Sequence, residues 1–242
     1  MKRNKWILVL TITALLVILE TSCKKKESND NNNPPVQETG TVTDVDGNIY
    51  KTVKIGSQWW MAENLKVTHY RNGDLLPNYT DSLMWSNTLN GARCYYNNDS
   101  IVYASVYGAL YNWYAINDSR QISPLGWHVP SDAEWIILLN YLGGLNIASG
   151  KMKETGTSHW QSPNSGANNS SGFTALPGGG RVNQLQQDFY FIYLGLSCDF
   201  WSSTENEAQF ASGFDMSFYD ETVGYSTGNK FTYGASIRCI KD

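Results

Sequence analysis

The sequence predicts an α+β domain made of short antiparallel strands, two helices and long ordered loops, and three observations support this fold class. Segments rich in β-branched and aromatic residues near the start are separated by Asp-Gly and Gly-Ser turn signals. Residues 131–144 combine a helix start signal, a helical repeat of apolar residues and a glycine stop. Residues 149–181 form a polar, glycine-rich stretch, and its length without regular structure indicates an ordered functional loop or a flexible insert.

The domain is expected to open with a β-meander. Residues 41–43 lead into an Asp-Gly turn at 44–48, and a β-rich segment follows at 49–55. After the Gly-Ser turn, residues 58–61 have the composition of the next strand. Three apolar side chains of the middle strand are expected to face partly inward: Ile49, Val53 and Ile55.

The middle and the end of the domain contain one further helix prediction and several strand predictions. Residues 106–116 are predicted to form the first helix, with Leu110, Trp113 and Tyr114 on one face. The last third of the chain holds four short strand candidates, at 189–194, 198–202, 209–217 and 235–240.

The second helix is the clearest element in the sequence. Ser131 and Glu134 have the spacing of a capping box, in which each side chain binds the other residue's backbone N–H. Gly143 and Gly144 then favour a left-handed helix end. Between these signals, four apolar residues repeat at helical spacing: Trp135, Leu138, Leu139 and Leu142.

The start of the chain has the pattern of a lipoprotein leader. Residues 1–22 are predicted to be a signal peptide, because a basic start and a short apolar run end at a small residue. Cys23 then stands in the position of a lipobox cysteine, which predicts that it carries lipid and anchors the chain in the membrane. An ordinary signal peptide with a chance cysteine is the alternative. Residues 23–40 are polar and are predicted to be a disordered tether, and one domain follows at 41–242.

Composition limits the classes of partner. The formal net charge is −4, and no cluster of basic residues occurs after the tether, so nucleic acid is not an expected partner. The chain contains 9 Trp and 15 Tyr but only 17% charged residues, which is typical of a loop-rich domain with aromatic anchors. Sequence alone permits any of three pairings among Cys94, Cys198 and Cys239 outside the cytoplasm.

Six segments in a fixed order resemble the Fibrobacter succinogenes major paralogous domain family, over residues 41–242. They are 44–65, 107–116 (YGALYNWYAI), 126–135 (GWHVPSDAEW), 172–179 (GFTALPGG), 201–205 (WSSTE) and 236–242 (SIRCIKD). The resemblance implies a C-type-lectin-like fold distantly shared with formylglycine-generating enzymes. It also implies an exported lipoprotein of Bacteroidetes type, located at the outer membrane or cell surface. Family members often have a cysteine where this chain has Ser123. If that cysteine normally pairs with the one near the C-terminus, Cys239 must pair with Cys94 or Cys198 or stay free. Of these alternatives, a Cys94–Cys239 disulfide is the one that we favour.

The sequence lacks two common motifs of catalytic and metal-binding sites. There is no His-Glu-x-x-His pair and no Gly-x-Ser-x-Gly elbow, so no catalytic residue, metal ligand or cofactor is predicted. His128 is interpreted as a structural residue beside the helix start. The Asp-Gly step at 44–48 fits a hairpin turn better than a calcium loop, because position twelve, counted from Asp44, is Ile55 rather than Glu.

The polar loop offers the strongest candidate for a ligand site. A tryptophan with amide and guanidinium donors is a common way to hold a sugar. The alternative is that Trp160 pins the loop to the core while the asparagines satisfy turns. The candidate residues are His159, Trp160, Asn164, Asn168, Asn169 and Arg181.

The predicted function is a lipid-anchored binding or structural module of the cell envelope, whose partner is a glycan or another envelope protein. We expect no enzymatic activity. The alternative is an enzyme related to formylglycine-generating enzymes, which bind copper through two cysteines, or an unknown hydrolase.

Overall fold

The computed structural model describes residues 37–182 and 190–242, and residues 37–242 form one compact unit. The predicted signal peptide, Cys23 and nearly all of the tether lie outside the described residues. No helix among the described residues is long and apolar enough to cross a membrane. The domain combines helices with antiparallel sheets, which confirms the predicted α+β class.

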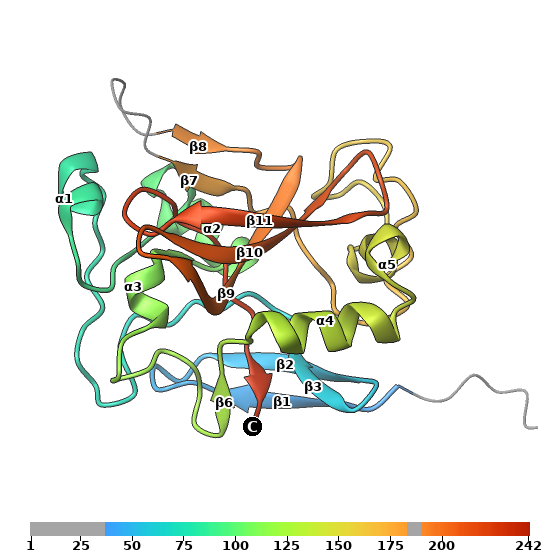
Figure 1. Cartoon of the computed structure of the whole chain (residues 1–242), viewed down its shortest axis with the longest axis horizontal. Helices are drawn as coiled ribbons and strands as arrows, with labels where there is room; N and C mark the ends of the chain where they lie inside the picture. The colour runs from blue at the N-terminus through green and yellow to red at the C-terminus, as the bar shows by residue number, and fades with distance from the viewer. Residues whose placement is uncertain (1–36, 183–189) are drawn as a thin grey trace, which may run out of the picture. The chain divides into compact units, whose positions relative to one another are not determined.

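A five-stranded sheet joins the two ends of the domain (Figure 1). The predicted meander is confirmed, although its first strand begins at residue 39, inside the predicted tether. The C-terminal strand (Ile240–Lys241) lies between the strands Gln58–Met61 and Trp127–His128, and every pairing is antiparallel. In order across the sheet, the strands are β1 (Thr39–Thr43), β2 (Ile49–Ile55), β3 (Gln58–Met61), β12 (Ile240–Lys241) and β6 (Trp127–His128).

A three-stranded sheet lies on the other side of the core, in the order β11-β10-β9 (Figure 1). Its strands are β9 (Ser197–Glu207), β10 (Phe210–Ser217) and β11 (Val223–Asn229). The predicted strands at 198–202 and 209–217 are confirmed, whereas β11 was not predicted. Two small sheets complete the set, namely β4 (Arg93–Cys94) with β5 (Leu110–Tyr111), and β7 (Gly180–Val182) with β8 (Tyr190–Ile192).

The helix prediction for 106–116 is wrong. Asp99 accepts hydrogen bonds from the backbone N–H groups of Ile101 and Val102, so a helix begins earlier in the chain. That helix ends at Gly108, whose φ is 73°. The remaining residues form β5 and one further helical turn. The helices in this region are α1 (Ser82–Asn87), the 3-10 turn η1 (Tyr96–Asn98), α2 (Ser100–Tyr107) and α3 (Trp113–Ile116).

Helix α4 (Asp132–Tyr141) has the predicted start, face and end. Both halves of the Ser131–Glu134 capping box are formed. Trp135, Leu138 and Leu139 are buried, and the two glycines after the helix have φ values of 102° and 98°. A further helix, α5 (Leu145–Met152), occupies the first part of the predicted loop, and irregular structure follows.

The main core lies between α4 and the two larger sheets and is rich in aromatic rings. The Trp135 ring is surrounded by four others, with centroids 4.9–5.9 Å away: Trp60, Phe173, Phe200 and Phe214. Val53 and Ile55 are buried as predicted, but Ile49 is 62% exposed. Tyr50 occupies the inward position at that end of β2, where its hydroxyl donates to Asp44 at 2.5 Å.

Candidate ligand-binding cavity

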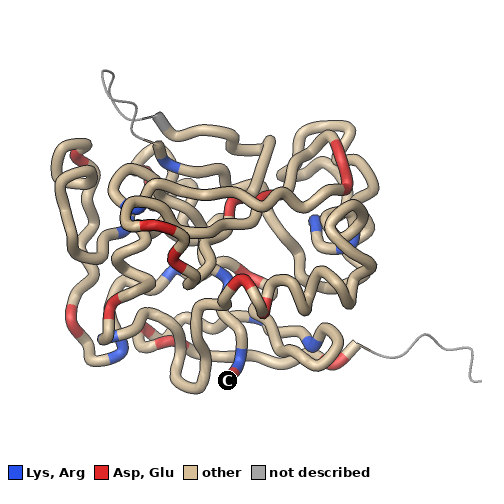
Figure 2. The backbone as a smooth tube through the Cα atoms, viewed as in Figure 1, with Lys and Arg blue, Asp and Glu red and all other residues tan. Residues whose placement is uncertain are grey.

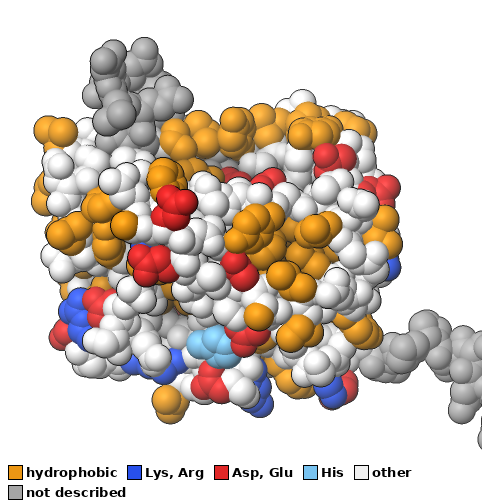
Figure 3. Space-filling view, viewed as in Figure 1, with side chains coloured by type: hydrophobic (Ala, Val, Ile, Leu, Met, Phe, Trp, Pro, Cys, Tyr) orange, Lys and Arg blue, Asp and Glu red, His pale blue; other side chains and the backbone are white. Residues whose placement is uncertain are grey.

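A cavity of about 510 Å³ lies over one face of the β9-β10-β11 sheet. This volume is in the range of small-molecule sites, which are about 300–1,000 Å³. Residues 192–193, 196–197 and 217–219 form part of its wall, together with residues from all three strands. Figure 3 shows the recess, where acidic side chains lie below a ridge of hydrophobic side chains at the top of the view.

The cavity face of the sheet follows from strand alternation. In β9, Cys198 and Phe200 belong to the core cluster around α4, so Asp199 and Trp201 point the other way. In β10, Phe214 and Met216 enter the same core cluster. Asp215 therefore points to the cavity, as does Gly213. Polar and small positions that look like interruptions in a strand thus form one continuous face.

Asp199 and Asp215 are direct partners across the two strands. Such partners have Cβ atoms about 4.5–5.5 Å apart on the same face. Asp199 accepts hydrogen bonds from the Tyr233 hydroxyl and, at 3.5 Å, from Ser197 Oγ. Asp215 accepts one from the side chain of Ser226 on β11. The two carboxyl groups therefore lie side by side in the cavity.

Burial and nearby negative charge raise the pKa of both carboxyl groups. Desolvation, followed by the charge of Asp215, raises the pKa of Asp199 to about 6, against hydrogen bonds from Tyr233 and Ser197. Desolvation also raises the pKa of Asp215, and the nearby Asp220 adds to this effect. Near neutral pH, Asp199 is therefore mostly ionised, but it takes up a proton at mildly acidic pH.

Three glycines keep the cavity open. A Cβ atom on Gly224, the cross-strand partner of Asp215, would lie 2.5 Å from Asp215 Oδ1. A Cβ atom on Gly228 would lie 2.3 Å from the Trp201 ring. At Gly213 it would lie 3.3 Å from Ser226 Oγ. Side chains are thus absent at the three positions of this face where they would fill the space beside the carboxyl groups or the Trp201 ring.

Aromatic rings supply much of the remaining surface. Tyr193 and Tyr219 are 54% and 63% exposed and form part of the rim. Deeper in the cavity, Tyr233 packs edge-on against Trp201 with centroids 5.6 Å apart. No Lys, Arg or His is among the described residues that line the cavity. Figure 2 shows acidic positions but no basic position on the three strands.

Residues 53–241 match the Fibrobacter succinogenes major domain. The chain belongs to this family. The matched region contains all three strands that carry the cavity, and it confirms the family that the six sequence segments indicated. No curated protein and no solved structure matches the chain.

Two of the loop residues predicted to hold a ligand, Trp160 and Arg181, are buried and make structural contacts. Trp160 is only 1% exposed, and its Nε1 donates to the Ala175 carbonyl at 3.0 Å, so the ring pins the loop to the core as the alternative proposed. Arg181 is fully buried and packs on the Trp85 ring, with 4.3 Å from guanidinium carbon to ring centroid. It donates to the backbone carbonyls of Tyr79 and Thr80.

The asparagines of the same loop satisfy local structure. The buried Asn164 donates to the carbonyls of Glu154 and Gly156 at 2.9 and 2.7 Å. Asn169 binds the side chain of Thr174, and the side chain of Asn168 accepts from the backbone of residue 170. Turn formation thus accounts for these amide groups.

His159 lies at a different place from the cavity on the sheet. Its Nδ1 is 2.8 Å from Glu154 Oε2, and its ring packs edge-on against Tyr107. Both His159 and Glu154 line a second, smaller cavity of about 280 Å³. The six residues of the predicted loop site therefore do not converge on one ligand.

The Cys94–Cys239 disulfide is not formed. Cys94, Cys198 and Cys239 are free, buried thiols, and each belongs to a different core cluster. Burial raises the pKa of Cys94 to about 11 and the pKa values of the other two thiols further. Such separated thiols do not fit a copper-binding pair.

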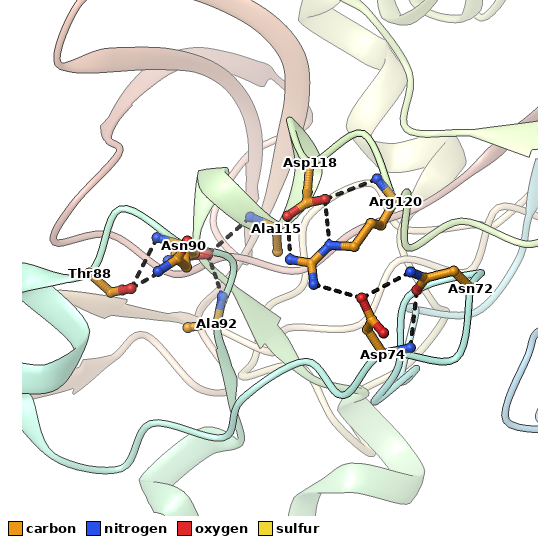
Figure 4. Close-up of polar contacts among 9 residues, drawn as sticks. Asn72, Asp74, Thr88, Asn90, Ala92, Ala115, Asp118 and Arg120 are labelled. Atoms are coloured by element: carbon orange, nitrogen blue, oxygen red, sulfur yellow. Dashed lines mark hydrogen bonds and ion pairs between the residues drawn. The ribbon is translucent and has the colours of Figure 1, made fainter.

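The other polar clusters have structural partners. His128 bridges Glu134 and Asp242 at 2.7 and 2.6 Å, as expected for a structural histidine. Arg120 binds Asp118 and Asp74 and links their loops (Figure 4). Asp44 closes its own turn by accepting from the backbone of residues 46 and 48. No group of three or more potential metal ligands occurs in the described parts of the chain.

Proposed function

We propose that this chain is a ligand-binding module of the cell envelope and that it holds a glycan in the cavity over β9, β10 and β11. The observation that carries the proposal is the pair of carboxyl groups, Asp199 and Asp215, beside aromatic rings in an open cavity. Carboxylates accept hydrogen bonds from sugar hydroxyls, tyrosine and serine hydroxyls donate or accept them, and aromatic rings pack against the apolar face of a sugar ring.

The location and the finer fold assignment belong to the same proposal. Lipid attached at Cys23 would hold the domain at the outer membrane or the cell surface. Exchange of Cys23→Ala should move the chain from the membrane fraction to the soluble fraction, and a variant that stays in the membrane fraction would refute lipidation there. The short antiparallel strands and the long irregular segment after α5 support a C-type-lectin-like arrangement.

The glycan proposal is tested with Gly224→Ala. The new methyl group would collide with the Asp215 carboxylate, so the carboxylate must move while the surrounding core stays intact. We expect binding to a broad glycan panel, measured by calorimetry, to fall by at least about tenfold in this variant, which is a loss of about 1.4 kcal/mol.

Gly178→Ala is the matched control. The methyl group would meet its nearest neighbours at the ordinary contact distance of 3.5 Å, and residue 178 does not line the cavity. This variant should bind like the wild type. The proposal would be refuted if the wild-type chain bound no glycan of the panel, or if Gly224→Ala bound as tightly as the wild type.

A hydrolase is the second candidate, favoured by the same carboxylate pair. Glycoside hydrolysis uses one carboxylic acid and one carboxylate, and a raised pKa suits the acid. Asp199 would be the acid and Asp215 the base or nucleophile. Incubation of each bound glycan with the wild type and with Asp199→Asn distinguishes the candidates. New reducing ends that appear only with the wild type would identify an enzyme, whereas intact glycan identifies a binding module.

A further inference from the structure

We infer that the cavity over β9, β10 and β11 selects ligands with a protonated primary amine, and hence an amino sugar where the ligand is a glycan. Two neighbouring carboxyl groups, Asp199 and Asp215, face one space whose described lining includes no Lys, Arg or His. The inference rests on the proposed function, because it concerns the same cavity and adds the charge of the ligand.

The charges that act on the pair from the elements packed against it are negative. Asp215 faces Asp199 from β10, and Asp220 acts on Asp215 from the segment before β11. The other titratable neighbours are hydroxyl groups, Tyr233 beside Asp199 and Tyr193 on the rim. No cation appears among the charges that act on either carboxyl group. A cationic ligand would therefore neutralise carboxylate charge that no described residue of the cavity lining neutralises.

A basic side chain packed behind the cavity wall, Lys153, binds backbone carbonyls. Lys153 is fully buried, and its ammonium donates to the carbonyls of Ser165, Ser217 and Asp220 at 2.7–3.0 Å. It does not line the cavity. All three N–H donors of this ammonium thus bind backbone carbonyls. Lys153 is not among the charges that act on Asp199 or Asp215.

An ammonium group matches this site better than a hydroxyl group does. An ammonium carries three N–H donors and a full charge, whereas a hydroxyl carries one donor. Hydrogen bonds between an ammonium and a carboxylate are about twice as strong as those between neutral groups. The rings of Tyr233 and Trp201 beside the pair can add a cation–π contribution.

The pH dependence separates a cationic ligand from a neutral one. Asp199 binds a proton as the pH falls through about 6, so a cationic ligand loses one of its two carboxylates. An alkylamine remains protonated over this range, so its affinity should fall from pH 7 to pH 5. The amine of a glucosamine unit is less basic because of its neighbouring oxygen atoms, and it gains protons itself as the pH falls. A neutral ligand can accept a hydrogen bond from the protonated carboxyl group and should not lose affinity in the same way.

The test uses two chito-oligosaccharides of equal length, the glucosamine tetramer and the N-acetylglucosamine tetramer. Calorimetry with the lipid-free full domain at pH 7 should show at least about tenfold tighter binding of the glucosamine tetramer. This preference should disappear in Asp215→Asn, whose melting temperature reports whether the fold is intact.

Glu38→Gln is the matched charge control, because Glu38 is remote from the cavity and pairs with Lys54. It removes the same net charge and should keep the preference for the glucosamine tetramer. If the preference were lost equally in Glu38→Gln, or persisted undiminished in Asp215→Asn, the inference would be overturned.

The remaining outcomes separate this inference from the proposed function. Equal binding of both tetramers, lost in Gly224→Ala, overturns the amine preference and leaves a glycan site in the cavity. Absence of binding by both tetramers overturns the amine preference, and silence of the whole panel overturns the glycan site as well.

Discussion

Replacement of Trp135 by alanine is expected to lower the free energy of unfolding by about 3–5 kcal/mol. The side chain is fully buried, and its ring lies 5.0 Å from Phe214 and 4.9 Å from Trp60, centroid to centroid. It joins α4 to both larger sheets, so truncation leaves a cavity where three elements meet. Chemical denaturation, followed by tryptophan fluorescence and circular dichroism, measures the loss.

The adjacent Ile136→Ala is the matched control. Ile136 is 49% exposed on the opposite side of the same helix, so its truncation should cost about 1 kcal/mol or less. A loss in Trp135→Ala no larger than that in Ile136→Ala would mean that the ring cluster is not the centre of the core.

Exchange of Arg238→Met is expected to cost at least about 3 kcal/mol of unfolding free energy, because several buried acceptors lose their donor together. Arg238 is fully buried and donates to the Asn64 side chain and to the carbonyls of Met61, Phe173 and Thr174 at 2.6–3.0 Å. Desolvation lowers the pKa of its guanidinium to about 9, which still leaves it charged at pH 7.

Arg238→Lys provides the comparison for this prediction. Lysine keeps the charge and up to three donors but lacks the planar guanidinium group. The free energy of unfolding of Arg238→Lys should therefore lie between those of the wild type and the methionine variant. Thermal and urea unfolding of the three proteins test the order. A methionine variant as stable as the wild type would show that the cost of burying the guanidinium cancels its hydrogen bonds.

Local signals predicted the elements that local chemistry determines. The capping box, the apolar repeat and the glycine stop of α4 all lie within one short segment, and the structure contains each of them. The opening meander is likewise built from adjacent strands and their turns. These interactions depend on residues close in sequence, so a sequence pattern can identify them.

The wrong helix shows what a local pattern misses. Residues 106–116 have helical spacing of apolar residues, but Gly108 and Asn112 break the helix through contacts made elsewhere. A Cβ atom on Gly108 would lie 2.6 Å from the Leu65 carbonyl. Asn112 accepts from the backbone of Ala92 and of Ala115. Contacts with residues far away in the chain thus override the spacing.

The candidate cavity could not be located from sequence for the same reason. Asp199 and Asp215 each sit between apolar residues, which predicts only that they point away from the core face of a strand. Their proximity depends on the register of β9 against β10, and the open space depends on glycines in β10 and β11. Conversely, Trp160 looks like a binding residue in sequence, yet its burial is set by packing of the whole loop.

The most direct test of the central claim is a backbone NMR titration of the lipid-free domain with the panel glycan that binds most tightly. The account predicts that amide shifts concentrate in residues 197–201, 213–217 and 224–228, which surround the carboxyl pair. Shifts that concentrate in the loop at 156–171, with these strands unchanged, would contradict it.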